Sequence, residues 1–255
     1  QQRELRAELD LLERYLRRST SASSSVVGGR VFATSARVLV GAPVGPQRVC
    51  PAAMAALLAD AAAALSSAAP PGKQRLCVEL CSGYGDWVVA RASSPSAAST
   101  VWCAVEVLAD RARSVWVRAA LAGVSGRVVT VCADAADVVC GGCLADSSVD
   151  ELHINFPEPP PPDTTPFYAA PRFVARAREA LKPGACVTLV TDSRRVALLA
   201  AKAYEEVAFA GTTTLATATI DRKGTAGKHG STSYFDRLWA NGHRATRYTV
   251  RAFKI

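Results

Sequence analysis

Short apolar runs alternate with helical stretches through the middle of the 255-residue chain. The apolar runs cover residues 75–80, 101–107, 127–132, 149–156 and 185–190. A helical stretch follows each run. The first begins after Gly85, the second ends at Ala122, and the third is short and follows residue 132. The fourth runs from about Tyr168 to Leu181, and the fifth ends at about Phe209. Strands that alternate with helices predict βα units and a parallel sheet.

The pattern changes after the fifth helical stretch. Residues 212–220 and 246–253 both read as strands, and the polar, basic segment 221–245 between them has no convincing helical pattern. Five βα units and a terminal pair of strands predict an α/β fold with a doubly wound, seven-stranded, mostly parallel sheet. This pattern is similar to the Rossmann-like sheet of class I methyltransferases, and it fits other doubly wound folds less well.

The first 70 residues follow a different pattern. Residues 3–18 predict a helix with one apolar stripe, which packs on the body of the protein or on a partner; the stripe is Leu5, Leu9, Leu12 and Leu16. Residues 51–66 are rich in Ala and predict a second helix, with Pro51 at its first position. We therefore expect an N-terminal helical extension and linker at 1–70 and a methyltransferase-type domain at 71–255.

Composition limits the classes of protein that remain. Hydrophobic residues make up 49% of the chain and charged residues 20%, which is globular. Thirty Lys and Arg against 22 Asp and Glu give a formal charge of +8, which favours either simple solubility or a polyanionic partner such as RNA. The sequence contains neither a run of 18 apolar residues nor a secretory leader pattern, so no membrane partner is expected.

The eight cysteines do not resemble a disulfide framework. Several lie inside apolar runs, where a reduced thiol behaves as a small hydrophobic group, so we expect an intracellular, reducing compartment. Cys140 and Cys143 have the spacing of a redox or zinc pair, but no second such pair exists, and no metal is expected. Because the chain starts at Gln1, the loss of a targeting peptide stays open as an interpretation. The sequence therefore does not distinguish between cytoplasm, nucleus and an organelle.

Acidic residues follow three successive apolar runs. Glu79 precedes a turn that contains Gly83 and Gly85, where glycines allow a ligand to approach the backbone. Glu106 ends the second run and can accept hydrogen bonds from ribose hydroxyls, and Asp134 follows the third run. Each acid alone is consistent with a solvated carboxylate. Together, at one edge of a parallel sheet, they predict a site for a nucleoside-containing cofactor.

The fourth apolar run ends in HINFPEPPPP, residues 153–162. The segment Asn155–Pro161 resembles the tRNA (guanine-N7)-methyltransferase family, whose fourth strand leads into a Phe-Pro-Asp-Pro-Trp-Pro-Lys type of motif. The resemblance covers about residues 75–255. Its other supporting segments are Glu79–Gly85, Val105–Val107, Asp134–Ala135, Leu181–Gly184, Thr191–Asp192, Ser233–Asp236 and Gly242–Arg244.

The resemblance implies S-adenosylmethionine as the cofactor and tRNA or another structured RNA as the partner. The implied cofactor-binding residues are Glu79, Gly83, Gly85, Glu106 on the ribose, and Asp134 and Ala135 near the adenine. Glu158 becomes the catalytic residue that aligns guanine with the methyl group, and its flanking prolines hold the loop extended. The implied substrate-binding residues are Asp192, Ser233, Asp236 and Arg244.

The sequence departs from the family pattern at chemically important positions. Glu158 replaces an Asp, Pro160 replaces a Trp, and Cys81 replaces the first glycine of the cofactor loop. The basic residues that follow the motif are absent, because 161–167 reads PPDTTPF. Two alternatives therefore stay open beside the enzyme: a catalytically silent, methyltransferase-like RNA-binding or assembly factor, and, with less support, a small-molecule methyltransferase.

Overall fold

The computed structural model places most of residues 74–207 and both C-terminal strands. It describes residues 30–31, 38–40, 52, 54–56, 58–59, 74–161, 163–207, 214–219 and 246–254. The predicted helix at 3–18 and the predicted basic segment 221–245 lie outside these residues.

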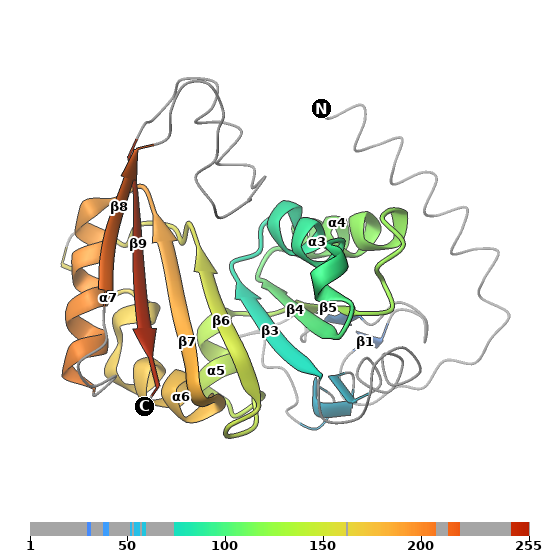
Figure 1. The fold of residues 1–255 in the computed structure, drawn as a ribbon, viewed down its shortest axis with the longest axis horizontal. Helices are drawn as coiled ribbons and strands as arrows, with labels where there is room; N and C mark the ends of the chain where they lie inside the picture. Colours follow the sequence, from blue (N-terminus) through green and yellow to red (C-terminus); the bar gives the residue numbers. More distant parts are fainter. Residues whose placement is uncertain are drawn as a thin grey trace, which may run out of the picture.

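One twisted sheet of nine strands forms the centre of the molecule (Figure 1). Its order is β1-β2-β5-β4-β3-β6-β7-β9-β8. The strands are β1 (Arg30–Val31), β2 (Val38–Val40), β3 (Arg75–Leu80), β4 (Thr100–Glu106), β5 (Val128–Cys132), β6 (Val149–Asn155), β7 (Leu181–Thr191), β8 (Thr214–Thr219) and β9 (Thr246–Phe253). β2 to β7 pair in parallel, whereas β1, β8 and β9 pair antiparallel with their neighbours.

The seven strands β3 to β9 confirm the predicted mostly parallel, doubly wound sheet. The strand count of seven is too low, because β1 and β2 extend the sheet beyond β5. These two strands have only 2 and 3 residues, too short for a period-2 pattern to be recognised in the sequence. They lie inside the range 1–70, where helices and a linker, but no strands, are predicted. The division into two domains stays a prediction.

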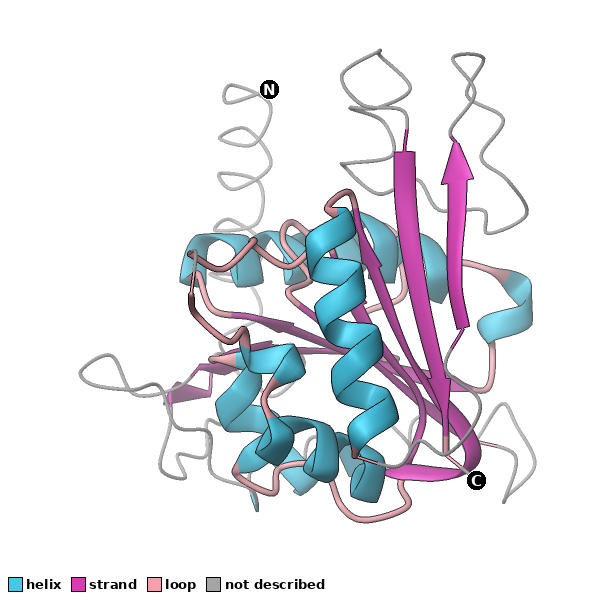
Figure 2. Ribbon diagram, turned by 90° about the vertical axis from the view of Figure 1, so that its left-hand side faces the viewer, coloured by secondary structure: helices cyan, strands magenta, loops and turns pink. Residues whose placement is uncertain are grey.

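Helices cover the sheet in two layers. They are α3 (Asp86–Ala92), α4 (Ala109–Leu121), α5 (Ala135–Cys140), α6 (Pro171–Ala180) and α7 (Arg194–Glu206). α3 and α4 lie over β3, β4 and β5 on one face, while α5, α6 and α7 cover the other face (Figure 1). Figure 2 shows the twist that carries the strand direction through a large angle across the sheet. None of the helices that the structure describes could cross a membrane.

β7 begins at Leu181, four residues before the strand predicted from 185. Pro183 cannot continue a helix, and the chain extends from the end of α6 directly into the sheet. Leu181 pairs with Val149, and the Gly184 amide donates to the Lys254 carbonyl oxygen at 2.7 Å. Tertiary pairing thus lengthens this strand beyond its apolar run.

The sheet's outer strands have one face without a described helix. Side chains at even positions of β6 and odd positions of β7 pack with α5, α6 and α7 in the main core, as Leu152, Ile154, Val187 and Leu189 show. The alternate side chains, including Glu151, His153, Asn155 and Thr188, point to the opposite face. Within the residues that the structure describes, only α3 flanks that face, beside β3 and β6 (Figure 1).

Candidate functional site

The turn after β3 has a left-handed backbone at three positions. The φ angles are 59° at Cys81, 56° at Gly83 and 80° at Gly85. A Cβ added to Gly85 would lie 2.9 Å from the Cα of Val115, whereas a Cβ on Gly83 would meet nothing within 4 Å. Gly85 is therefore required for packing between α3 and α4, and Gly83 leaves open space beside its backbone.

Glu106 holds this turn in place. One carboxylate oxygen accepts a hydrogen bond from the Gly83 amide at 2.8 Å, and the other accepts one from the Leu108 amide at 3.0 Å. The residue is only 5% exposed. Because each carboxylate oxygen has two lone pairs, both oxygens can still accept a ribose hydroxyl. The predicted ribose-binding acid is thus also the residue that connects β4 to the turn after β3.

The three predicted acids lie around the Cys81 thiol. Burial and, to a smaller extent, the nearby Glu106, Glu79 and Asp134 together raise the pKa of Cys81 to about 12. The thiol is therefore protonated at neutral pH. Asp134 is exposed and caps α5, because its Oδ1 accepts from the Ala136 and Asp137 amides at 2.7 and 3.3 Å. Ala135, the first residue of α5, is buried beside this cap.

Glu79 lies at the end of β3 and is 2% exposed. Its Oε1 accepts a hydrogen bond from the Asn155 side-chain amide at 2.8 Å, and the carboxyl group also faces the Val88 amide of α3. Burial raises the pKa of Glu79 to about 8, although the bond from Asn155 opposes the shift. Asn155 belongs to the fourth-strand motif, so this bond joins the motif to the cofactor turn.

A pH-dependent stability follows from Glu79. Its folded pKa of about 8 exceeds the reference value of 4.5, so its contribution is fully favourable below 4.5 and is lost as the pH rises to about 8. The loss has an upper bound on the order of 5 kcal/mol. Glu79→Gln keeps the acceptor for Asn155 and removes the titration. We expect the variant to match its parent near pH 5 and to exceed its stability at pH 8.5.

Urea unfolding at several pH values measures this difference. The buried His153 has a lowered pKa, so it titrates below 6.5, outside the upper part of this window. A Glu79→Gln stability difference that stays constant from pH 6 to pH 8.5 would show that Glu79 is already ionised in the folded protein.

Glu158 lies in an irregular segment that leaves the same sheet edge. Phe156 has a left-handed φ of 49°, and its amide donates to the Val190 carbonyl oxygen at 2.7 Å. Pro157 is buried and Glu158 is exposed. Asp192 follows β7, the strand that pairs with β6, so Glu158 and Asp192 leave adjacent strands at one edge. Their roles stay predictions, and Ser233, Asp236 and Arg244 lie outside the described residues.

Several side chains near the site were not predicted. His153 is 8% exposed and packs against Trp87, with 4.6 Å between the ring centroids and 51° between the ring planes. The guanidinium carbon of Arg91 lies 5.4 Å from the Trp87 ring centroid. A signal was present in β6, where Glu151, His153 and Asn155 occupy alternate positions. A central parallel strand is usually apolar on both faces, so this polar alternation indicates a face that contacts something other than core.

Fold and site together define a Rossmann-like methyltransferase. The parallel strands end at one edge of the sheet, where the acids of β3 and β4 and the α5 cap surround a glycine-containing turn. A family model described as "putative methyltransferase" matches residues 73–247. The chain belongs to this putative methyltransferase family.

Curated relatives have the same type of name as the predicted family. The chain is 38% identical over 86 residues to the tRNA (guanine-N(7)-)-methyltransferase of Chlamydia trachomatis serovar D, covering 34% of this chain and 37% of that protein. It is 29% identical over 139 residues to the Chlamydia pneumoniae enzyme of the same name, covering 51% and 57%. The predicted resemblance is thereby confirmed. The chain spans between about a third and three fifths of the length of these relatives.

Solved structures support the fold. A 16S rRNA (adenine(1408)-N(1))-methyltransferase from Catenulisporales acidiphilia aligns with a TM-score of 0.53 at 16% identity, covering 85% of this chain and 98% of that one. An antibiotic-related methyltransferase aligns with a TM-score of 0.53 at 13% identity, covering 80% and 94%. At these identities the likeness shows the class I methyltransferase fold alone.

The residues at the sheet edge fit S-adenosylmethionine. The space beside Gly83 admits a ligand against the backbone, and Glu106 retains acceptor capacity for hydroxyls. A cationic ligand beside the buried Glu79 would favour the ionised form of this acid, whose pKa is raised to about 8 without a ligand. Cys140 and Cys143 form no disulfide in the part of the chain that the structure describes, and those residues contain no group of three or more His, Cys, Asp and Glu that could hold a metal ion.

Proposed function

We propose that this protein methylates N7 of a guanine in tRNA, with S-adenosylmethionine as methyl donor. The observation that carries the proposal is the 2.8 Å hydrogen bond from Asn155 to Glu79. It ties the strand that leads to Glu158 to the turn that would hold the donor. The similarity to tRNA (guanine-N(7)-)-methyltransferases supports guanine N7 as the acceptor.

The chemistry requires alignment more than proton transfer. The bound cofactor supplies an electrophilic methyl group on a sulfonium. Guanine N7 offers a lone pair, so the protein removes no proton to start the reaction; the carbon–sulfur bond breaks as the nitrogen–carbon bond forms. Glu158 would hold the guanine edge and balance the positive charge that develops on the base. Correct alignment contributes up to roughly 7–11 kcal/mol in well-oriented reactions.

The resemblance to the tRNA (guanine-N7)-methyltransferase family implies the remaining substrate contacts. Asp192 would seat the base from the neighbouring strand, because β6 and β7 end side by side at this edge. Ser233 and Asp236 would close over the guanine, and Arg244 would contact the RNA backbone. Glu79, Glu106, Asp134 and Ala135 would hold the cofactor with Gly83 and Gly85.

Removing the Glu106 carboxylate should weaken cofactor binding. Glu106→Ala takes away acceptors for the Gly83 and Leu108 amides as well as the proposed ribose contact. We expect a loss of about 1–3 kcal/mol, which is roughly 5- to 150-fold in Kd. Isothermal calorimetry with S-adenosylmethionine and its demethylated product measures the loss. Glu205→Ala, at an exposed position of α7 on the opposite face, is the matched control.

One reaction tests the proposed function as a whole. The purified chain is incubated with labelled S-adenosylmethionine and total tRNA, and the modified nucleosides are then identified by mass spectrometry. N7-methylguanosine supports the proposal. Label in another nucleoside, or in small molecules alone, would replace it with a different methyltransferase activity. Cofactor binding without any methyl transfer would favour the silent RNA-binding protein.

A further inference from the structure

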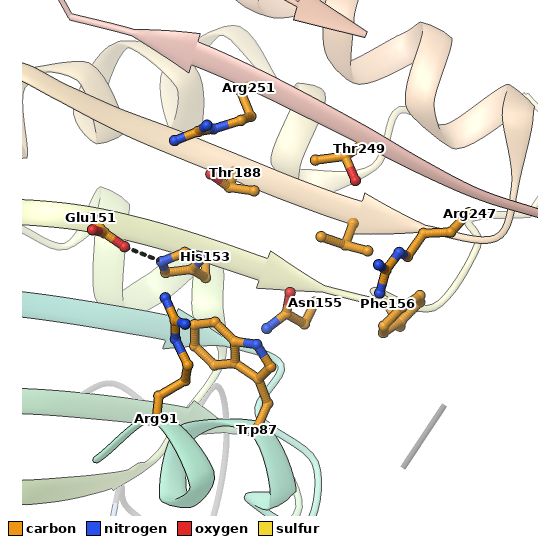
Figure 3. Close-up of a pocket in the computed structure, with 11 residues that line it drawn as sticks. Trp87, Arg91, Glu151, His153, Asn155, Phe156, Thr188, Arg247, Thr249 and Arg251 are labelled. Carbon is orange, nitrogen blue, oxygen red and sulfur yellow. Dashed lines mark hydrogen bonds and ion pairs between the residues drawn. The ribbon is translucent and has the colours of Figure 1, made fainter. Parts of the chain in front are cut away.

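A pocket of about 190 Å³ lies on the open face of β6, β7 and β9, beside α3 (Figure 3). One row across the sheet brings together His153, Thr188 and Arg251, which are direct register partners on the three strands. The pocket is lined by Trp87, Arg91, Glu151, His153, Asn155, Phe156, Thr188, Val190, Arg247, Thr249 and Arg251.

The lining has an excess of positive charge. It contains three arginines, Arg91, Arg247 and Arg251, against one carboxylate, Glu151. Glu151 accepts hydrogen bonds from Arg75 at 2.5 Å and pairs with His153 at 2.8 Å, which holds its pKa at about 2. Arg75 lies outside the lining, and Glu151 pairs with it and with His153 rather than with Arg91 or Arg251.

Aromatic rings hold two of these arginines in position. Arg91 lies 5.4 Å from the Trp87 centroid, and Arg251 lies 5.1 Å from the Phe253 centroid. In the part of the chain that the structure describes, neither guanidinium forms an ion pair. A guanidinium stacked on a ring still presents its N–H edge, the group that recognises phosphate oxygens in pairs. Such stacking fixes the side chain before a ligand arrives.

Neutral groups complete a donor-rich lining. Thr188 and Thr249 contribute hydroxyls on neighbouring strands. His153 is buried, and burial together with the nearby Arg91 and Arg251 lowers its pKa, so its ring is uncharged near neutral pH. In Figure 3, Arg91 rises from α3 toward His153, while Arg251 and Arg247 project from β9. The lining suits a compact anion with several acceptor oxygens.

The pocket adjoins the proposed catalytic segment. Asn155 and Phe156 line it, and the chain then continues through Pro157 to Glu158. We propose that the pocket binds a phosphodiester group of the RNA strand next to the guanine that enters the site. The identity of the ligand as RNA rests on the proposed function. The size of the pocket fits a phosphate group, whereas the rest of the nucleotide would lie outside on the sheet edge.

Charge-neutral variants of the arginines test this subsite. Arg251→Gln and Arg91→Gln remove the charge, Arg251→Lys retains it, and Arg172→Gln, on α6 at the opposite face, is the matched control. The full chain is titrated with a short guanine-containing single-stranded RNA over a series of KCl concentrations. We expect each pocket variant to lose roughly tenfold in affinity at low salt. The slope of log K against log salt should shrink by about 0.7 for each lost phosphate contact.

The results separate the subsite from its neighbours. Arg172→Gln should keep the parental slope, and thermal unfolding should show that all the variants are folded. Unchanged slopes in folded Arg251→Gln and Arg91→Gln would overturn the proposal. The proposal would also be overturned if Arg251→Gln and Arg91→Gln lost as much affinity for S-adenosylmethionine as for RNA, because the pocket would then belong to the cofactor site. Competition by inorganic phosphate with no change in RNA slope would make it a free-phosphate site and overturn it too. A slope change in a protein that methylates no tRNA would reject the proposed function and keep the subsite.

Discussion

Glu158→Gln is expected to slow methyl transfer about 100-fold, the scale of losing one group that stabilises the transition state. The affinity for S-adenosylmethionine should change by less than about twofold, because the charge matters once positive charge develops on the guanine. Glu158 is exposed, so the substitution leaves the fold intact. Single-turnover methylation of tRNA at saturating cofactor measures the chemical step directly.

The same segment supplies a matched control. Asp163 is also exposed, and its φ of 65° is a conformation that Asn tolerates, so Asp163→Asn changes charge equally near Glu158. It should retain nearly the parental rate. Glu158→Asp should match or exceed the parent, since the related motif carries the shorter acid. A Glu158→Gln rate equal to that of the parent would remove this carboxylate from the mechanism.

Gly85→Ala should destabilise the folded protein by about 3 kcal/mol, from the left-handed backbone and from overpacking. The new methyl group would lie 2.9 Å from the Cα of Val115, and a backbone atom cannot rotate away. The midpoint of thermal unfolding should fall by about 6–12 °C for a domain of this size. Differential scanning calorimetry measures both values.

Gly83→Ala separates the two causes. Its φ of 56° is equally left-handed, but its added methyl group meets nothing within 4 Å. We expect a loss of only about 1 kcal/mol, and a larger loss of cofactor affinity than in Gly85→Ala if a ligand fills that space. Equal destabilisation by the two variants would mean that contact with Val115 costs little.

The regular elements could be predicted because local pattern and tertiary pairing agree. The runs at 75–80 and 246–253 match β3 and β9 to the residue, since each is bounded by residues that leave the sheet. The acids Glu79 and Glu106 were predicted from their place at the ends of strands. In an α/β fold the topology brings the carboxyl ends of parallel strands to one edge, so a residue's place at a strand end already locates it near the site.

The pocket could not be predicted in the same way. Arg91 and Arg251 are 160 positions apart, and only the insertion of β9 beside β7 brings them to one face. The strands β1 and β2 were missed because partner strands, not internal pattern, define segments of 2 and 3 residues. A local stretch of sequence does not show which distant strand it will pair with, so elements defined by such pairing cannot be predicted from it.

The order of β7, β9 and β8 in the sheet has a consequence for biosynthesis. β9 lies between β7 and β8, although it is made after both. Until residues 246–253 have left the ribosome, the nascent chain presents the edge of β7 from Cys186 to Thr191 without its antiparallel partner. An unpaired edge of this length invites pairing with other chains. A chaperone that shields β7 during synthesis would therefore have to act, and then leave, before Arg251 reaches its place.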